Sequence, residues 1–101
     1  MRRAAKIDQN QPEIVKALRQ AGATVQSLAA VGAGCPDLLV GYANRTALIE
    51  LKNGSNVPSA QKLRPLQEDW HGSWTGGTLA TVNSVEGALR VLSVMTKELQ
   101  A

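Results

Sequence analysis

The sequence predicts one α/β domain over residues 1–101, in the order helix, three strands, helix, strand, helix. Two short apolar runs flank a turn in the middle of the chain, which is typical of a hairpin. Apolar residues recur at helical spacing before this hairpin and again toward the end of the chain. A length of 101 residues with 44% hydrophobic content leaves room for one modest core and no second domain.

The first predicted helix runs from Gln11 to Ala21. Pro12 stands near its start and Gly22 just past its end, as is usual for helices. Its apolar stripe consists of Ile14, Leu18 and Ala21. Thr24 to Leu28 follows as a candidate strand.

The next segment, Ala29 to Gly34, is small and contains glycine. It would let a phosphate backbone approach closely, although an ordinary loop fits equally well. Its glycines precede a strand and match no nucleotide-binding fingerprint, so we expect no nucleotide cofactor. Cys35, the one cysteine, is expected to be a small packed residue; it rules out an intramolecular disulfide framework and fits a reducing compartment.

The predicted hairpin consists of Leu38 to Tyr42 and Ala47 to Leu51, with Asn44 between them as a residue that tolerates tight turns. Both apolar runs are continuous, which predicts strands that are covered on both faces. Side chains alternate along a strand, so Glu50 and Lys52 share one face. Charges that enter such a sheet are too costly to be incidental, although a solvated surface ion pair is the simpler alternative.

Three registers remain open for this hairpin. A turn centred just before Asn44 places Asp37 opposite Glu50, and one centred just after it places Asp37 opposite Lys52. In both cases the three charges share a face. A three-residue loop would instead place Asp37 opposite Leu51 and send it to the other face.

Two carboxylates on opposed strand positions, with Cβ atoms about 5 Å apart, call for a cation between them. Oxygen ligands select hard ions, so the predicted cofactor is Mg²⁺ or Mn²⁺. The neighbouring Lys52 would position a water molecule or stabilise charge that develops on a phosphate. The residue types at Asp37, Glu50 and Lys52 therefore indicate phosphodiester cleavage.

Asn53 to Leu63 is predicted to be a polar loop, after which Pro65 opens a helix. Leu66 and Trp70, four residues apart, are expected to pack this helix on the sheet and to leave Gln67 near the edge of that face. His71 is expected to be a cap or surface residue. Trp74 would stack on an exposed base, pack at a subunit contact or cover the core.

Gly76 and Gly77 predict a turn, and Thr78 to Val82 a strand. Asn83 to Glu86 has the pattern of a capping box, so a last helix is expected to about Leu99. Its apolar stripe is Val85, Ala88, Leu89, Leu92, Met95 and Leu99.

The chain resembles a known nuclease family. The segments GCPDLLVG (34–41) and LIELK (48–52) are similar to those of the virus-type replication-repair nuclease (VRR-NUC) family of the PD-(D/E)xK superfamily. The resemblance extends upstream to Glu13 and downstream to LRPLQ (63–67) and VNSVEGAL (82–89), so it covers nearly the whole chain. It implies an αβββαβ core with a mixed central sheet flanked by helices, here with a closing C-terminal helix.

The resemblance also implies a site. Asp37, Glu50 and the backbone carbonyl of Leu51 would hold Mg²⁺ or Mn²⁺, Lys52 would assist the chemistry, and a first-helix acid and a glutamine would support them. The glutamine is Gln67 or the nearby Gln61. The acid is Glu13, which would reach the metal directly or through a water molecule; alternatively, Glu13 only completes a capping box with Asn10.

The family implies a structure-specific DNA endonuclease acting in replication, repair or recombination. A chain this short resembles the standalone phage or bacterial members, for which the family implies homodimers that cut branched DNA such as four-way (Holliday) junctions. A non-catalytic or RNA-directed nucleic-acid-binding module of the same fold is the alternative. With three aromatic residues in the chain, self-association through Trp70, Trp74 and the outer face of the last helix would help to close a small core.

The formal net charge of +3 and the pI near 9.4 are compatible with a polyanionic partner. The predicted phosphate contacts are Arg2, Arg3, Lys62 and Arg64. No apolar run has the length of a signal peptide or a membrane span, so we expect no membrane partner and a cytoplasmic location, in the host if the chain is phage-encoded.

Overall fold

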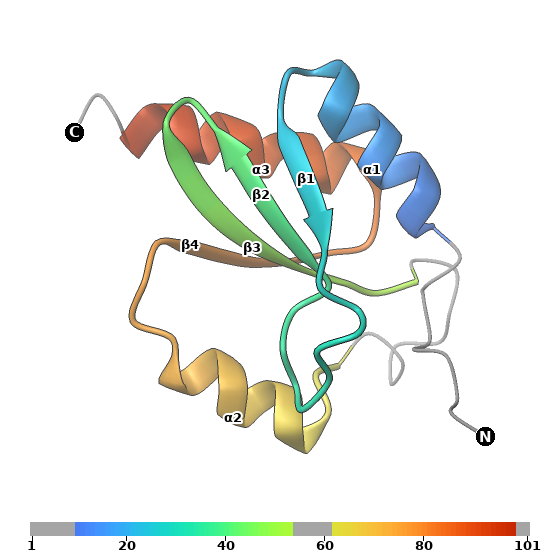
Figure 1. The fold of residues 1–101 in the computed structure, drawn as a ribbon, viewed down its shortest axis with the longest axis vertical. Helices are drawn as coiled ribbons and strands as arrows, with labels where there is room; N and C mark the ends of the chain where they lie inside the picture. Colours follow the sequence, from blue (N-terminus) through green and yellow to red (C-terminus); the bar gives the residue numbers. More distant parts are fainter. Residues whose placement is uncertain (1–9, 54–61, 99–101) are drawn as a thin grey trace.

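The computed structural model describes residues 10–53 and 62–98, and it has the predicted order of elements (Figure 1). The helices are α1 (Gln11–Gln20), α2 (Pro65–Ser73) and α3 (Val85–Glu98), and the strands are β1 (Thr24–Ser27), β2 (Leu38–Tyr42), β3 (Arg45–Leu51) and β4 (Thr78–Val82). Predicted and observed bounds differ by at most two residues where both can be compared. The α/β class is therefore confirmed.

The four strands form one mixed sheet in the order β1-β2-β3-β4. The pairs β1–β2 and β2–β3 are antiparallel, whereas β3 and β4 are parallel. A parallel pair needs a crossover connection, and here α2 lies within it. In Figure 1 the last strand therefore comes to lie beside β3 at the edge of the sheet.

The hairpin turn consists of Ala43 and Asn44, with φ angles of 53° and 62°. Both residues lie in the left-handed region, as a two-residue type I′ turn requires. The register then pairs Leu38 with Ile49 and Tyr42 with Arg45. Continued by one residue, it places Asp37 opposite Glu50, which is the first of the three registers that the sequence left open.

The hydrophobic core lies between one face of the sheet and the helices α1 and α3. Alternate residues of β2 and β3 point to this face, and the helices meet them with apolar stripes. The fully buried members are Ile14, Leu18, Leu38, Val40, Ile49, Leu51, Ala88 and Met95. In α3, Leu89 is 37% exposed and Val91 is buried instead, so the predicted stripe was wrong at this position.

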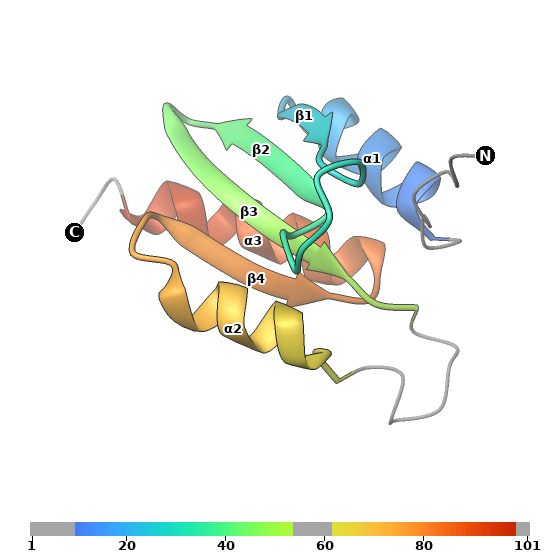
Figure 2. The ribbon, with the colours of Figure 1, turned by 60° about the horizontal axis from the view of Figure 1, so that its bottom comes forward.

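The opposite face of the sheet is only partly covered. Helix α2 lies on this side, next to β4 (Figure 2), and its nine residues include no buried one. Strand β3 is buried on both faces, but Leu39 of β2 is 37% exposed. The prediction that both strands are covered on both faces was therefore wrong for β2, because α2 lies next to β4 and leaves Leu39 partly exposed.

Helix α2 also turns a different face to the sheet than predicted. Leu66 is 62% exposed, whereas Gln67 and His71, four residues apart, are half-buried. Trp70 is half-buried and stacks on Trp74, with ring centroids 5.3 Å apart. Because Gln67 is held by polar groups of β3, the helix is rotated by about one residue from the arrangement that an apolar contact of Leu66 would give.

Both predicted capping boxes differ from the structure. Asn10 makes no cap with its side chain; its amide instead donates to the carbonyl oxygens of Lys52 (3.1 Å) and Asn83 (3.2 Å). At the start of α3 the cap is Ser84, whose Oγ accepts from the backbone N–H of Gly87 at 3.0 Å. The sequence pattern therefore located this helix start with an error of one residue.

None of the helices in the described ranges is long and apolar enough to cross a membrane.

Candidate metal and phosphate site

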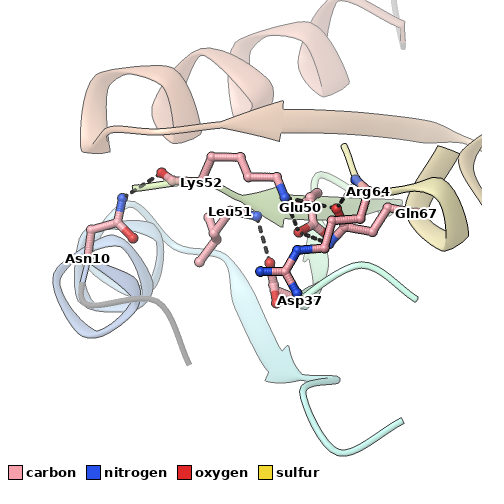
Figure 3. A network of polar contacts seen from close by, with 7 residues as sticks. All are labelled: Asn10, Asp37, Glu50, Leu51, Lys52, Arg64 and Gln67. Atoms are coloured by element: carbon pink, nitrogen blue, oxygen red, sulfur yellow. Dashed lines mark hydrogen bonds and ion pairs between the residues drawn. The ribbon is translucent and has the colours of Figure 1, made fainter. Parts of the chain in front are cut away.

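The candidate site lies where β2 begins and β3 ends. Asp37 comes directly before β2, and its Oδ2 accepts a hydrogen bond of 2.7 Å from the backbone N–H of Leu51, near the end of β3 (Figure 3). Its own carbonyl accepts from the N–H of Leu28, also at 2.7 Å. The side chain of Asp37 thus occupies a position at which the ladder would otherwise need a backbone acceptor.

Glu50 and Lys52 project together from the face of the sheet that is opposite the hydrophobic core. Glu50 is 3% exposed and Lys52 is 8% exposed, which is unusual for charged residues. The Nζ of Lys52 lies 3.7 Å from Oε2 of Glu50. These charges are therefore not the solvated surface pair that was the simpler alternative.

Gln67 of α2 joins these two charges. Its Nε2 donates to Oε2 of Glu50 at 2.9 Å, and its Oε1 accepts from Nζ of Lys52 at 2.8 Å (Figure 3). The same oxygen accepts from the backbone N–H of Arg64 at 2.9 Å, which fixes the side chain at the start of the helix. An amide suits this place because it offers a donor to the carboxylate and an acceptor to the ammonium group.

The backbone carbonyl of Leu51 lies on the Asp37 side of β3. The N–H and C=O groups of one strand residue point toward the same neighbouring strand, and the Leu51 N–H is bonded to Asp37. The next residue turns the other way, since the N–H of Lys52 donates to the carbonyl of Val82 at 2.9 Å. The Leu51 carbonyl is thus placed beside Asp37 at the end of the strand.

Family models, curated proteins and solved structures were compared with this chain, and none matched. The resemblance to the VRR-NUC family therefore depends on the sequence segments alone.

The predicted site residues do not all come together. Glu50, Lys52 and Gln67 form one bonded cluster and Asp37 is held next to it by the backbone of Leu51, whereas Glu13 is exposed in the first turn of α1. The hydrogen bonds of the cluster do not include it. Gln61, the alternative glutamine, lies outside the described residues.

Asn10 is a residue whose role the sequence did not indicate. Through Lys52 and Asn83 it ties the start of α1 to the ends of β3 and β4, next to the cluster. In the sequence it had the pattern of a helix cap, and nothing in that pattern shows contacts 42 and 73 residues away. It supports the backbone of Lys52 from the side opposite to Gln67.

The predicted phosphate contacts are placed in part. Lys62 and Arg64 are exposed, and Arg64 lies at the rim of the cluster through its backbone bond to Gln67. Arg2 and Arg3 lie outside the described residues.

Two more titratable groups lie around the cluster. Burial, and then the charges of Glu50 and Asp37, raise the pKa of the half-buried Cys35 thiol, which is therefore kept protonated. Burial, and then the charge of Lys52, lower the pKa of His71. The Nε2 atom of His71 is buried and has no hydrogen-bond partner, so of the two predicted roles, cap or surface residue, a fully exposed surface residue was wrong. Its backbone carbonyl accepts from the N–H of Trp74 at 3.3 Å, at the end of α2.

The donors of the cluster fit a hard divalent cation. In the described ranges no three His, Cys, Asp or Glu side chains gather closely enough to hold a metal ion. The pair Asp37 and Glu50, with the Leu51 carbonyl, offers oxygen ligands only, and Mg²⁺ is commonly bound by one or two carboxylates with waters and phosphate oxygens as further ligands.

Proposed function

We propose that this protein is a metal-dependent DNA endonuclease of the VRR-NUC type, with a PD-(D/E)xK core. One observation carries the proposal: the two-residue turn brings Asp37 opposite Glu50, with Lys52 on the same face and Gln67 closing the cluster. Two acidic residues and a lysine, together at the end of neighbouring strands, match the constellation that hydrolysis of a phosphodiester needs.

The burial of the Glu50 and Lys52 charges supports a functional role for these residues over a structural one. A buried ion pair seldom stabilises a fold more than apolar side chains of the same size would, because desolvation offsets the attraction. Glu50 and Lys52 are nearly as buried as Ile49 and Leu51 of the same strand, yet the chain keeps them polar. Their presence is explained if the cluster acts on a charged ligand.

Asp37, Glu50 and the Leu51 carbonyl would hold Mg²⁺ or Mn²⁺. When bound, the cation would supply Lewis-acid stabilisation of charge on the phosphate. The ammonium group of Lys52 is held by Gln67 and Glu50, so it is oriented before a substrate arrives and can position the attacking water or stabilise the developing negative charge. Gln67 bonds to both Glu50 and Lys52 and so fixes their side chains relative to each other.

The proposed substrate is DNA, with branched structures such as four-way junctions as the favoured class, and the proposed active form is a homodimer. The net charge of +3, the exposed Lys62 and the exposed Arg64 at the rim of the cluster support a polyanionic substrate. The preference for branches and the homodimer come from the family resemblance, and a twofold axis would present two sites to two strands.

The test is incubation of the protein with labelled linear, flapped and four-way DNA, and with a linear RNA of the same sequence, with and without Mn²⁺. We expect cleavage of DNA that requires the metal and is lost in the Glu50→Gln variant, which keeps the shape of the side chain. Cleavage that survives this substitution would come from a contaminating nuclease. Binding without cleavage would favour the non-catalytic module, and cleavage of RNA alone the RNA-directed alternative.

A further inference from the structure

The loop between β1 and β2, residues 28–37, touches the first turn of α2 at Gly34. A Cβ atom added at this residue would overlap the backbone oxygen of Leu66 and lie 2.6 Å from its carbonyl carbon and 3.0 Å from the backbone nitrogen of Gln67. Real Cβ atoms essentially never approach other atoms so closely, and backbone atoms of a helix cannot swing aside as a long side chain can. The contact therefore exists only because residue 34 has no side chain.

The loop itself is braced. Hydrogen bonds join Leu28 to Asp37, Val31 to Leu28 and Cys35 to Gly32, at 2.7 to 3.1 Å. If residue 34 carried a Cβ atom, the loop could not easily move away from α2, because these hydrogen bonds hold it in place. The strain would fall on the helix.

Helix α2 is the element most easily displaced by such a push. None of its residues is buried, in contrast to α1 and α3, whose apolar stripes lie in the core. The first turn of α2 is held by the polar contacts of Gln67 and by the approach of Gly34. With so few contacts, the place of Gln67 depends strongly on each of them.

We propose that Gly34 is a positioning residue of the candidate site: its bare backbone lets the 28–37 loop seat the first turn of α2 so that the Gln67 amide reaches both Glu50 and Lys52. The same loop ends at Asp37, three residues further on. Gly34 therefore couples the two halves of the site, the Asp37 end of the hairpin and the α2 end. Its consequence for catalysis rests on the proposed nuclease function; its consequence for the position of Gln67 does not.

Backbone conformation alone would also explain a glycine here, since φ of Gly34 is +84°. The loop contains its own control for this explanation. Gly32 has a φ of +71°, and a Cβ atom at Gly32 would meet nothing within 4 Å. Ala33, with φ 56°, shows that this loop accepts a side chain in the left-handed region. Alanine at positions 32 and 34 therefore carries a similar backbone strain, and a collision with α2 is expected at position 34 alone.

The experiment compares Gly34→Ala with Gly32→Ala by NMR, using the side-chain amide signals of Gln67, assigned with a Gln67→Ala variant. We expect Gly34→Ala to shift these signals and to speed their exchange with solvent, and Gly32→Ala to leave them as in the wild type. Unchanged Gln67 signals in Gly34→Ala, or equal shifts in both variants, would overturn the proposal. If Gly34→Ala does not fold, the wild type still decides. A nuclear Overhauser contact between Gly34 Hα and the backbone amide proton of Gln67 is expected. Its absence would contradict the contact between the loop and the first turn of α2.

Cleavage rates give a second, independent test. Gly34→Ala is expected to lower the rate about ten- to a hundredfold, as a small misplacement of a site group does. Gly34→Ala combined with Gln67→Ala should be no slower than Gln67→Ala alone, because both act through one side chain. Multiplying losses would overturn the positioning role. A wild type that cuts no DNA would refute the proposed function, while the Gln67 signals would still decide the role of Gly34.

Discussion

At Ile49 and Glu50 the two faces of strand β3 are both buried, but by opposite kinds of chemistry. On one face Ile49 is 0% exposed among the apolar side chains of α1 and α3; on the other Glu50 is 3% exposed beside Lys52 and Gln67. The core face is closed by two helices with long apolar stripes, whereas the site face is closed by one short helix without a buried residue. Stability and the proposed activity are thus separated across the thickness of one sheet, and neighbouring residues of one strand can test the separation.

The largest effect is expected on the core face. Ile49→Ala should lower the free energy of unfolding by about 2 to 5 kcal/mol, because it leaves a cavity in a packed core. Its neighbour in the chain is the comparison: Glu50→Gln keeps the volume and an acceptor oxygen for the Gln67 amide and loses the ion pair with Lys52, whose ammonium group Gln67 still holds, so its loss should be smaller, about 1 to 3 kcal/mol. Urea unfolding of both variants measures this. Equal losses would mean that the polar cluster stabilises the fold as much as the core does.

The next effect concerns the site face alone. Lys52→Ala is expected to lower the cleavage rate about 100-fold or more, because a preoriented charge is lost, and to leave DNA affinity nearly unchanged. Replacing Lys62 and Arg64 should do the reverse, weakening binding across sequences and reducing its salt dependence. Cleavage rates and binding isotherms at several salt concentrations distinguish the two. An equal loss of affinity in Lys52→Ala would make this lysine a phosphate anchor.

The strands β2 and β3 were largely predictable from the sequence, whereas the register in which they pair was not. Alternation and turn residues located β2, β3 and the shared face of Glu50 and Lys52. Whether the turn begins at Ala43 could not be decided from the sequence. Alanine rarely adopts a positive φ, and the neighbouring residues do not show that Ala43 adopts one. The positive φ of Ala43, together with that of Asn44, determines the register that places Asp37 opposite Glu50.

The rest of the site depends on contacts between distant parts of the chain. Asn10 has the pattern of a cap but bonds to the ends of β3 and β4, and Gly34 meets α2 at Leu66, 32 positions away in the sequence. The exposure of Leu39 depends on α2 lying next to β4 instead of over β2, which no pattern within β2 reveals. Tertiary contacts of this kind override local propensity.

A further prediction concerns apolar surface that neither face of the sheet covers. Trp74, directly after α2, is 37% exposed, and Leu89 and Val94 of α3 are 37% and 47% exposed. The helices α2 and α3 lie on the two sides of β4 (Figure 2). We expect a homodimer that buries such surface, with sedimentation at micromolar concentration giving twice the chain mass of 10.7 kDa. A monomer that cuts both strands of a four-way junction in concert would contradict the dimer, and one that nicks flaps would indicate an asymmetric enzyme.

The smallest predicted effect is the titration of His71, the one histidine of the chain. Burial, and then the Lys52 charge, lower its pKa below the usual value of about 6.5. The unfolded chain therefore binds more protons between the two pKa values, so stability from this group is complete above about pH 6.5 and is lost as the pH falls through the folded-state pKa. An NMR titration should give a midpoint below 6.5 that rises in Lys52→Ala. A midpoint at or above 6.5 in the wild type would place His71 outside the site.

Metal binding without any substrate tests the proposed site at Asp37 and Glu50 directly. Mn²⁺ is paramagnetic, so titrating it into the labelled protein should broaden the NMR signals around Asp37, Glu50 and Leu51 first and leave those of the core face around Met95 sharp. We expect this selective broadening to be lost in Asp37→Asn, which keeps the shape of the side chain and an oxygen to accept from Leu51. Broadening that is absent in the wild type, centred elsewhere, or unchanged in Asp37→Asn would mean that Asp37 and Glu50 hold no metal.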